Sequence, residues 1–442
     1  MTLLQTESPL RIDSTTTQTT PEKWATISLY AFLISMVAAP FMSVGERVAS
    51  TGEGNALRQL MFLVVFMLAI FATRCVRPHF KIIALPFSLS VTLLYCLVSL
   101  KWSEAASIGI RRLFLTALVM MIIFMNAQIL SFKQTSGIIR RVLVGVLFAN
   151  FFVVAFAPGT GIHGASEVSG FGMDPELIGS WKGVLAHKNF AGSFCAMTIL
   201  FLVIEAEEWS VALRAFLVFL TAIFLWKSAS KTSAGLVVVA LFISYFYGKY
   251  NHYYRKIVVP TLALLIAGMT AAIWVNWDAI SKPFNRPDAF TGRVAIWRVL
   301  YRYWQDHPFG AGYGSFFNIG DNKPIAHYTK GPKDWVSLVP EAHSGYMDLL
   351  ISIGTFGTIL AIFALLILPV SKLMLWRPET KAQGMLALAM LIFCAGHNFT
   401  EASFLDRDSI VEVFLLFAIA FVEKTTRADR LQDWQFAANR HG

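Results

Sequence analysis

Charged residues are scarce in this sequence. Asp, Glu, Lys and Arg make up 14% of the 442 residues, whereas hydrophobic residues make up 56%. A soluble domain usually has about 25% charged and about 45–50% apolar residues. The mean hydropathy is +0.59. This composition excludes an ordinary soluble enzyme and predicts a polytopic membrane protein.

Cysteine is also rare, with four residues in the chain. Cys96, Cys195 and Cys394 lie inside apolar segments, and Cys75 directly follows one. Cysteines placed in this way are typical of small packing residues rather than of a disulfide framework. The sequence therefore does not predict a disulfide-stapled secreted domain.

Metal-binding and nucleic-acid-binding patterns are missing as well. No His/Asp/Glu set has the spacing of a zinc helix such as H-E-x-x-H, and no aspartate pair suggests magnesium on a diphosphate. The formal net charge is +10, but the basic residues stand singly or in pairs at the ends of apolar segments. That pattern favours topology control over nucleic-acid binding. We expect no metal, no cofactor and no nucleic-acid partner.

Long apolar segments, in contrast, recur along almost the whole chain. A membrane span needs about 20 predominantly apolar residues. We predict an all-α fold with about twelve transmembrane helices, at approximately the following positions: 24–43, 59–75, 82–100, 111–130, 142–157, 183–204, 211–226, 233–247, 257–277, 346–370, 382–397 and 409–423.

The basic residues predict the orientation, because short cytoplasmic loops are enriched in Lys and Arg. The basic short loops are 74–81, 133–141, 249–256 and 372–381. Both termini are then cytoplasmic, and the long polar segments 158–182 and 278–345 lie outside. The predicted organisation is a disordered tail (1–22), nine spans (23–277), a large periplasmic loop (278–345), three spans (346–423) and a cytoplasmic tail (424–442).

The large polar segment contains a predicted amphipathic helix, which starts at Gly292 and ends before Pro308. Its apolar positions Val294, Trp297, Leu300, Tyr301 and Trp304 recur at helical spacing. A helix rich in Trp and Tyr is expected to lie on the membrane interface.

Two residues of this segment are candidates for chemistry. Arg293 stands at the start of the predicted helix, where its guanidinium and the backbone N–H groups could converge on a phosphate. His343, between Glu341 and Ser344, could accept a proton from a sugar hydroxyl, with Glu341 or Asp348 orienting the ring. The alternatives are that Arg293 snorkels to headgroups and that His343 is a structural residue. Arg298 is a further candidate for substrate or headgroup contact.

Polar residues also gather near the ends of other apolar segments. His187, Lys188 and Asn189 stand in succession, which predicts a wet cavity or, alternatively, contacts between helices. Lys227 and Lys231 flank a Ser-rich turn that could hold a phosphate or be an ordinary polar turn. A final group, formed by His397, Asn398 and Glu401, could complete the wall of the cavity, but for it we favour a structural role.

Taken together, several short motifs resemble those of the O-antigen ligase/polymerase superfamily, and most closely the polymerases of succinoglycan-type exopolysaccharides. The motifs are Gly183 to Gly192, Ser228 to Thr232, Gly292-Arg293 with Trp297 and His307 to Gly312, and Glu341 to Tyr346 with Gly354. The resemblance covers about residues 180–405.

The resemblance implies a GT-C-like fold and a metal-independent, inverting glycosyl transfer at the periplasmic face of the bacterial inner membrane. The implied donor is an undecaprenyl-diphosphate-linked oligosaccharide, with membrane lipid around it and a chain-length-regulating co-polymerase as a partner. It also implies that Arg293 and Lys231 hold the diphosphate and that His343 serves the acceptor hydroxyl. Many relatives have Arg where this chain has Lys231, and lysine cannot form a bidentate fork.

Three functions remain open at this point. The first is a polymerase that transfers the glycan onto the next lipid-linked repeat unit, and the second is a ligase that transfers it to another acceptor. The third is a transporter or flippase for the lipid-linked oligosaccharide. Transporters usually place charged sites at mid-membrane and show repeat symmetry, whereas the charges here cluster at the ends of apolar segments.

Overall fold

The computed structural model describes residues 20–43, 56–74, 85–164, 177–282, 292–320, 324–329 and 334–438. Over these ranges the chain is helical and contains no strand, with one isolated β-bridge between Ile162 and Trp181. Cys75 and the tail before residue 20 lie outside the described residues. The predicted all-α class is confirmed.

Each of the twelve predicted apolar segments overlaps a helix. The helices are α1 (Thr20–Ser43), α2 (Ala56–Arg74), α3 (Phe87–Ser99), α4 (Ala106–Ile129), α5 (Phe132–Phe156), α8 (Lys188–Ile204), α9 (Val211–Lys227), α10 (Lys231–Lys249), α11 (Arg255–Val275), α14 (Gly345–Ile362) with its continuation α15 (Leu368–Leu375), α16 (Lys381–His397) and α17 (Ile410–Ala438).

Five helical segments in the described ranges are long and apolar enough to cross a membrane. They are 106–129, 132–156, 231–249, 252–275 and 345–375. The chain is therefore an all-α membrane protein, whereas the number of twelve spans stays a prediction. One boundary differs from expectation: α17 continues as a helix to Ala438, so no helix ends at the predicted start of the tail at residue 424.

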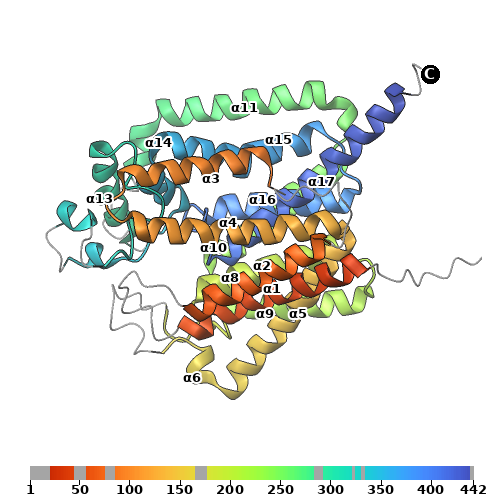
Figure 1. The fold of residues 1–442 in the computed structure, drawn as a ribbon, viewed down its shortest axis with the longest axis horizontal. Helices are drawn as coiled ribbons and strands as arrows, with labels where there is room; N and C mark the ends of the chain where they lie inside the picture. The colour runs from red at the N-terminus through yellow and green to blue at the C-terminus, as the bar shows by residue number, and fades with distance from the viewer. Residues whose placement is uncertain are drawn as a thin grey trace, which may run out of the picture.

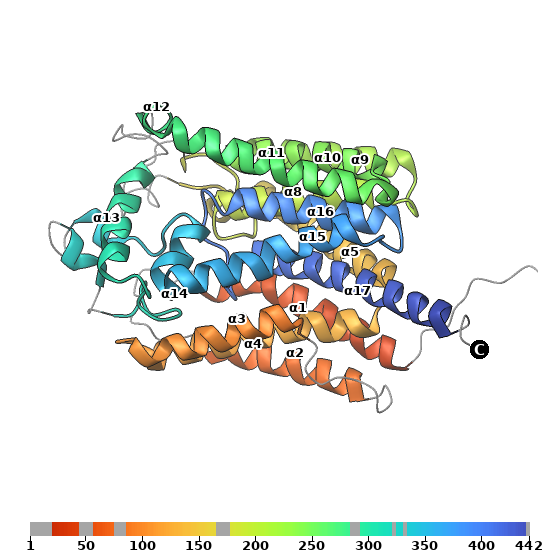
Figure 2. The ribbon, with the colours of Figure 1, turned by 90° about the horizontal axis from the view of Figure 1, so that it is seen from above.

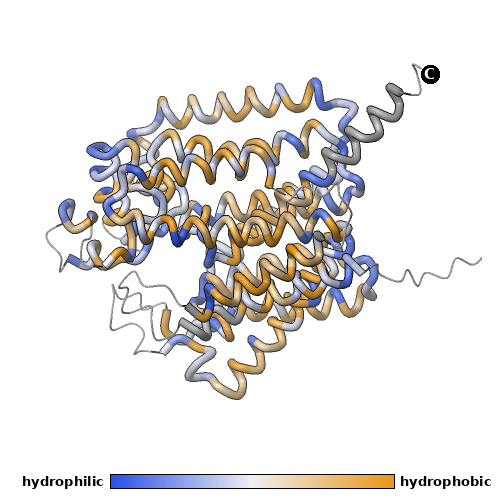
Figure 3. The backbone as a smooth tube through the Cα atoms, viewed as in Figure 1, coloured by the Kyte–Doolittle hydropathy of each residue, from blue (hydrophilic) through white to orange (hydrophobic). Residues whose placement is uncertain are grey.

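The long helices run side by side as a bundle, and the short helix α13 (Arg293–Asp306) lies at one end of it (Figures 1 and 2). Hydrophobic residues occupy the middle of the long helices, and hydrophilic residues gather towards the two ends (Figure 3). The core is built mainly by α4, α8, α16 and the first turns of α17, whose side chains are largely buried. This distribution is expected of a protein whose middle lies in hydrocarbon and whose ends meet water.

Helix α13 confirms the predicted amphipathic helix but buries a different face. Its buried residues are Val294, Ile296, Leu300 and Tyr303, which form a second, small core with neighbouring loops. Tyr301, expected on the apolar face, is 49% exposed. Part of its apolar face is therefore covered by the protein itself, and its position at the membrane interface stays a prediction.

A break in α14 anchors the end of α13. Gly354 has φ 69° and ψ −175°, which interrupts the helix. The chain that follows α13 fills the break, because the Thr355 N–H donates to the Pro308 carbonyl (3.0 Å) and the Ala311 N–H donates to the Ile351 carbonyl (2.8 Å). A Cβ at Gly354 would lie 2.4 Å from the Phe309 carbonyl carbon. Glycine is therefore required for this close approach, which holds α13 over the bundle.

Candidate functional site

Four segments converge at the α13 end of the bundle. They are the start of α13, the loop before α14, the loop between α16 and α17, and the first turn of α8. The loop between α16 and α17 is joined to α14 by its backbone, since the Gly345 N–H donates to the carbonyls of Asn398 (2.8 Å) and Glu401 (3.0 Å). Asn398 also orders that loop by accepting from the N–H groups of Ser403 and Phe404. These contacts fix loops that are distant in the sequence beside one another.

Arg293 is the first residue of α13 and follows Gly292, which has a left-handed backbone with φ 82°. The Arg293 Nη2 donates to Glu401 Oε1 at 2.6 Å. Asn189 Nδ2, in the first turn of α8, donates to the same oxygen, also at 2.6 Å. The side chains of Arg293 and Glu401 are 18% and 14% exposed. Glu401 therefore bridges two helices that meet at this end.

His343 lies in the loop before α14, with its Nδ1 3.1 Å from Glu341 Oε1. Its backbone φ is +48°, an uncommon conformation for a residue that is not glycine. The preceding carbonyl, of Ala342, accepts from the Trp297 indole N–H at 3.0 Å. A strained backbone costs about 1–3 kcal/mol and is frequent at functional sites, where the surroundings enforce it. The ring of His343 is thus held against Glu341 by contacts from α13.

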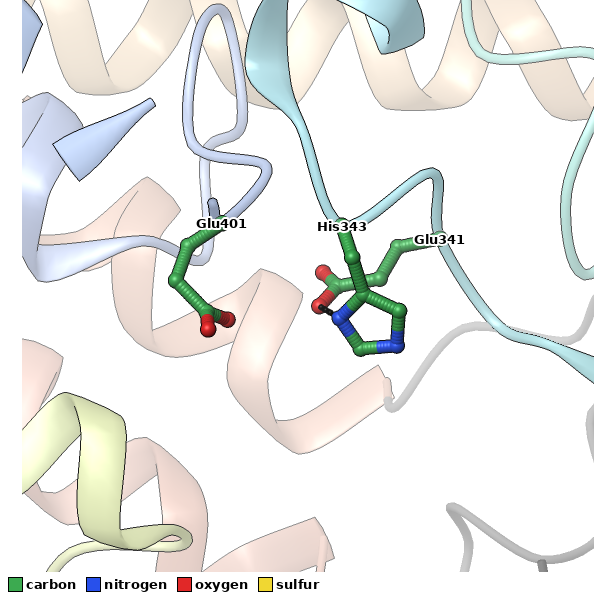
Figure 4. A group of neighbouring side chains, drawn as sticks. All are labelled: Glu341, His343 and Glu401. Carbon is green, nitrogen blue, oxygen red and sulfur yellow. Dashed lines mark ion pairs between the residues drawn. The ribbon is translucent and has the colours of Figure 1, made fainter. Parts of the chain in front are cut away.

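Figure 4 shows the resulting group, in which the Glu401 carboxylate and the Glu341–His343 pair point towards one another. One potential ligand atom from each of Glu341, His343 and Glu401 lies within 4.8 Å of the others. The cluster combines one guanidinium, one imidazole and two carboxylates. We call Arg293, Glu341, His343 and Glu401 the polar cluster.

The electrostatics of the cluster favour a charged Glu341–His343 pair. Burial alone would raise the pKa of Glu341, but the contact with His343 lowers it below its usual value. Burial alone would lower the pKa of His343, but Glu341 and, more weakly, Glu401 raise it above its usual value. Burial and the Glu341 charge raise the pKa of Glu401 to about 7, against the opposing charge of Arg293. Glu401 therefore titrates near neutral pH.

The spacing of Glu341, His343 and Glu401 could hold a metal ion. However, Glu401 Oε1 already receives hydrogen bonds from a guanidinium and an amide. A cation placed there would face the positive charge of Arg293 and would have to displace it from this oxygen. The cluster is better suited to an anion on the Arg293 side and a proton on the His343 side, and the absence of a metal stays a prediction.

The predicted group His187, Lys188 and Asn189 divides into different roles. His187 caps α8, because its Nδ1 accepts from the Asn189 N–H at 3.2 Å. The Lys188 N–H donates to His163 Nε2 at 3.1 Å, and the His163 and His187 rings are 5.2 Å apart. Asn189 contacts Glu401, a member of the polar cluster. The capping of α8 thus positions Asn189.

The Ser-rich turn is more structural than the sequence suggested. Ser228, Ser230 and Ser233 are buried. Ser228 donates to the Leu225 carbonyl, and Ser230 donates to Ser233. Their hydroxyls are used inside the helix pair rather than presented to a ligand.

The two lysines of this turn are exposed. Lys227 lies over the rings of Trp181 (5.9 Å) and Trp226 (5.0 Å). Lys231 is the first residue of α10. The hydroxyl of Thr400, the neighbour of Glu401, donates to the hydroxyl of the next residue, Thr232, at 3.4 Å. Lys231 therefore lies beside the loop that carries Glu401. Arg298 is exposed on α13.

Glu401 is the functional candidate that sequence reasoning undervalued. It was assigned a structural role with His397 and Asn398, and Asn398 does have one. The available signal was its position directly after an apolar helix, on the same side as Arg293 and His343. What the sequence could not show is that its carboxylate meets Arg293 and Asn189, which are 108 and 212 positions away.

Comparison with known proteins found one family. A protein-family model described as O-antigen ligase matches residues 215–362. The match covers about a third of the chain and includes Lys231, Arg293 and His343 but neither Asn189 nor Glu401. A search of curated proteins found no match.

Proposed function

The chain carries the O-antigen ligase domain of the O-antigen ligase/polymerase superfamily, and from that premise we propose that it is an exopolysaccharide polymerase. It transfers a glycan from undecaprenyl diphosphate onto a lipid-linked repeat unit at the periplasmic face of the inner membrane. The family match supports a membrane glycan ligase or polymerase in general. The identities of the acceptor, of the donor and of the site residues are our proposal.

The observation that carries the proposal is the convergence of Arg293 and His343, 50 positions apart in the sequence, on one cluster joined by Glu341 and Glu401. Glycosyl transfer from a polyprenyl diphosphate needs a cation at the leaving group and a base at the attacking hydroxyl. Arg293 and His343 supply these two groups. Their side chains are 18% and 30% exposed, so both are partly enclosed.

In the proposed reaction, a hydroxyl oxygen of the acceptor sugar attacks the anomeric carbon of the donor, and its proton passes to His343. The bond between the anomeric carbon and the phosphate oxygen breaks, and the electron pair leaves with the diphosphate. Arg293 stabilises the charge that develops on the leaving group. Glu341 fixes the ring of His343 and stabilises its positive charge after proton transfer.

Other predicted residues take supporting roles in this proposal. Lys231, at the start of α10, adds positive charge beside the loop of Glu401. Asn189 holds Glu401 in place. Lys227, Arg298, His187 and Lys188 contribute to the surroundings of the bound substrate.

The test uses cells in which the gene has been deleted and then restored with wild-type protein, His343→Ala or Glu104→Gln. Glu104 is exposed near the start of α4 and serves as the matched control. We expect the deletion and His343→Ala to accumulate single lipid-linked repeat units, and Glu104→Gln to restore long polymer. Normal polymer from His343→Ala cells that contain the protein would contradict the assignment.

The same experiment separates the second candidate, a ligase. The donor side of the site would be identical for a polymerase and a ligase. Full-length polymer that lacks its attachment in the deletion cells would favour the ligase. The polar cluster lies at the α13 end of the bundle (Figure 2), which disfavours the third candidate, a transporter, because its substrate site would be expected near the membrane centre.

A further inference from the structure

Glu401 contacts the guanidinium of Arg293, which is the group that a phosphate would bind. Its Oε1 lies 2.6 Å from Arg293 Nη2. Carboxylates and phosphates bind a guanidinium through the same planar N–H donors, so the two compete for it. Without substrate, one nitrogen of the Arg293 guanidinium is therefore already bound by an acidic side chain of the protein.

A bound diphosphate would also repel this carboxylate. Two anions on one guanidinium repel each other strongly in a partly buried site. The Glu401 side chain is 14% exposed, so water screens this repulsion only weakly. The carboxylate must then leave Arg293, or the diphosphate cannot bind there.

His343 is the nearest alternative partner for the displaced carboxylate. A ring nitrogen of His343 and a Glu401 oxygen lie within 4.8 Å of each other, and Figure 4 shows the two side chains extending side by side from their loops. A rotation of the Glu401 side chain would close this gap while its backbone stays bonded to Gly345. A second carboxylate beside the ring would make His343 a stronger base.

We propose that Glu401 exchanges partners, pairing with Arg293 in the free protein and with His343 once the donor diphosphate has taken Arg293. This proposal rests on the proposed function and adds a positioning residue to it. Its consequence is that the base reaches full strength only when the donor is bound. An acceptor that binds without the donor therefore does not find His343 activated.

The first experiment measures the binding of inorganic pyrophosphate to the full-length protein in lipid nanodiscs by calorimetry. Glu401→Gln removes the competing charge but keeps an oxygen for Asn189. We expect it to bind pyrophosphate about tenfold more tightly than wild type, since a charge-assisted contact no longer has to be displaced. Glu104→Gln, which removes one exposed carboxylate, should bind like wild type.

The exchange is tested by whether Glu401→Gln binds pyrophosphate more tightly or more weakly than wild type. If Glu401 only held Arg293 in position, Glu401→Gln would bind pyrophosphate as weakly as wild type or more weakly, and this result overturns the exchange. Arg293→Ala separates the two proposals, because it should abolish binding with either residue at position 401. Unchanged pyrophosphate binding in Arg293→Ala would instead contradict the proposed donor site itself.

A second variant guards against a change in folding. Glu401→Asp keeps the charge but is one methylene shorter, so its carboxylate cannot reach Arg293 in the observed backbone. It should also bind pyrophosphate more tightly and melt within a few degrees of wild type. Agreement of both variants supports the exchange, and weaker binding by both overturns it.

The second readout is the pH profile of transfer at saturating donor. Loss of the carboxylate lowers the pKa of His343, so the acidic limb of the profile should move to lower pH in Glu401→Gln. Turnover at neutral pH should fall while the apparent donor affinity rises. A profile identical to that of wild type, with unchanged turnover, would remove Glu401 from the activation of His343.

Discussion

Two partly or fully enclosed arginines lie near opposite ends of α8. Asn189, in the first turn of α8, shares Glu401 with Arg293, whereas Glu205, at the other end of the helix, contacts Arg140. A helix of this length spans roughly 25 Å. The same type of residue therefore occurs in two environments connected by one element.

Arg140 is buried and has several partners. Its side chain is 2% exposed, and it contacts Glu205 Oε2 at 2.7 Å and Glu208 Oε2 at 3.1 Å. It also donates to the Glu205 carbonyl and lies 4.8 Å from the Trp209 ring centroid. Carboxylates, a carbonyl and an aromatic face thus enclose a single guanidinium.

Arg293 has a more open environment. Its Nη2 meets one carboxylate, its side chain is 18% exposed, and the carboxylate has a second neighbour in His343. An arginine closed on all sides stabilises the fold but cannot exchange partners. An arginine with one carboxylate partner can exchange it for an anion in the proposed function. We therefore expect a structural role at one end of α8 and chemistry at the other.

The largest expected effect is on the closed arginine. Arg140→Ala leaves two carboxylates without their cation, which should cost about 3–5 kcal/mol of stability. We expect a much lower melting temperature and little protein in the membrane, measured by thermal unfolding in detergent and by immunoblot. Arg141→Ala, one residue further along and exposed, should melt like wild type.

If Arg140→Ala instead melts like wild type and loses only activity, the two arginines do not differ as the structure indicates. Arg140 would then not stabilise the fold as its enclosed position predicts.

The open arginine should show the opposite pattern. Arg293→Ala is expected to lower the rate of transfer by about 10²–10³-fold, as loss of a preorganised donor at developing charge usually does. Its melting temperature should stay close to that of wild type. The measurement is the rate of polymer formation by purified protein, normalised to folded protein.

Arg302→Ala provides the control on the same helix, because Arg302 is exposed on α13. It should retain its rate. An equal loss in both variants would mean that α13 needs positive charge in general rather than Arg293 in particular.

This contrast also marks what the sequence could predict. The apolar segments predicted the helices because membrane spans follow from composition alone, and the Gly292-Arg293 pair marked the start of α13. Residues in one local motif, such as Glu341 and His343, could be paired from their spacing. The partner of Arg293 could not, because Glu401 reaches it through the hydrogen bonds that join the loop after α16 to the start of α14, which no local pattern encodes.

The buried face of α13 could not be predicted for a related reason. Helical spacing identified an apolar face with Tyr301, but the insertion of the Pro308–Gly310 turn into the break of α14 rotates the packing towards Ile296 and Tyr303. The break depends on the positive φ of Gly354. A glycine inside an apolar helix is common, so the role of Gly354 in the contact between α14 and the chain after α13 could be seen only in the structure.

A smaller effect concerns the proton side of the open cluster. His343 must be neutral to accept a proton, so the rate should rise with pH through the pKa of its imidazole. Glu341 raises that pKa, so Glu341→Gln should lower it and move the acidic limb to lower pH. A pH–rate profile measures this shift, with Glu104→Gln as the control.

A limb that moves to higher pH in Glu341→Gln would contradict the pairing of Glu341 with His343. A profile without any acidic limb would indicate that the group titrating in the wild type is not His343.

The smallest effect is expected at Lys231, the exposed counterpart of Arg293. An exposed charge contributes about 0–1 kcal/mol to an ionic contact, so Lys231→Ala should weaken pyrophosphate binding only a few-fold. Salt screens exposed charges more than enclosed ones, so this loss should shrink from about 50 mM to about 300 mM salt, whereas the loss in Arg293→Ala should persist. Lys231→Arg should bind like wild type. Lys231→Ala could instead lose as much pyrophosphate binding as Arg293→Ala, with the same resistance to salt. Lys231 would then enter the enclosed site when substrate binds, and its exposure in the free protein would not predict a smaller contribution than that of Arg293.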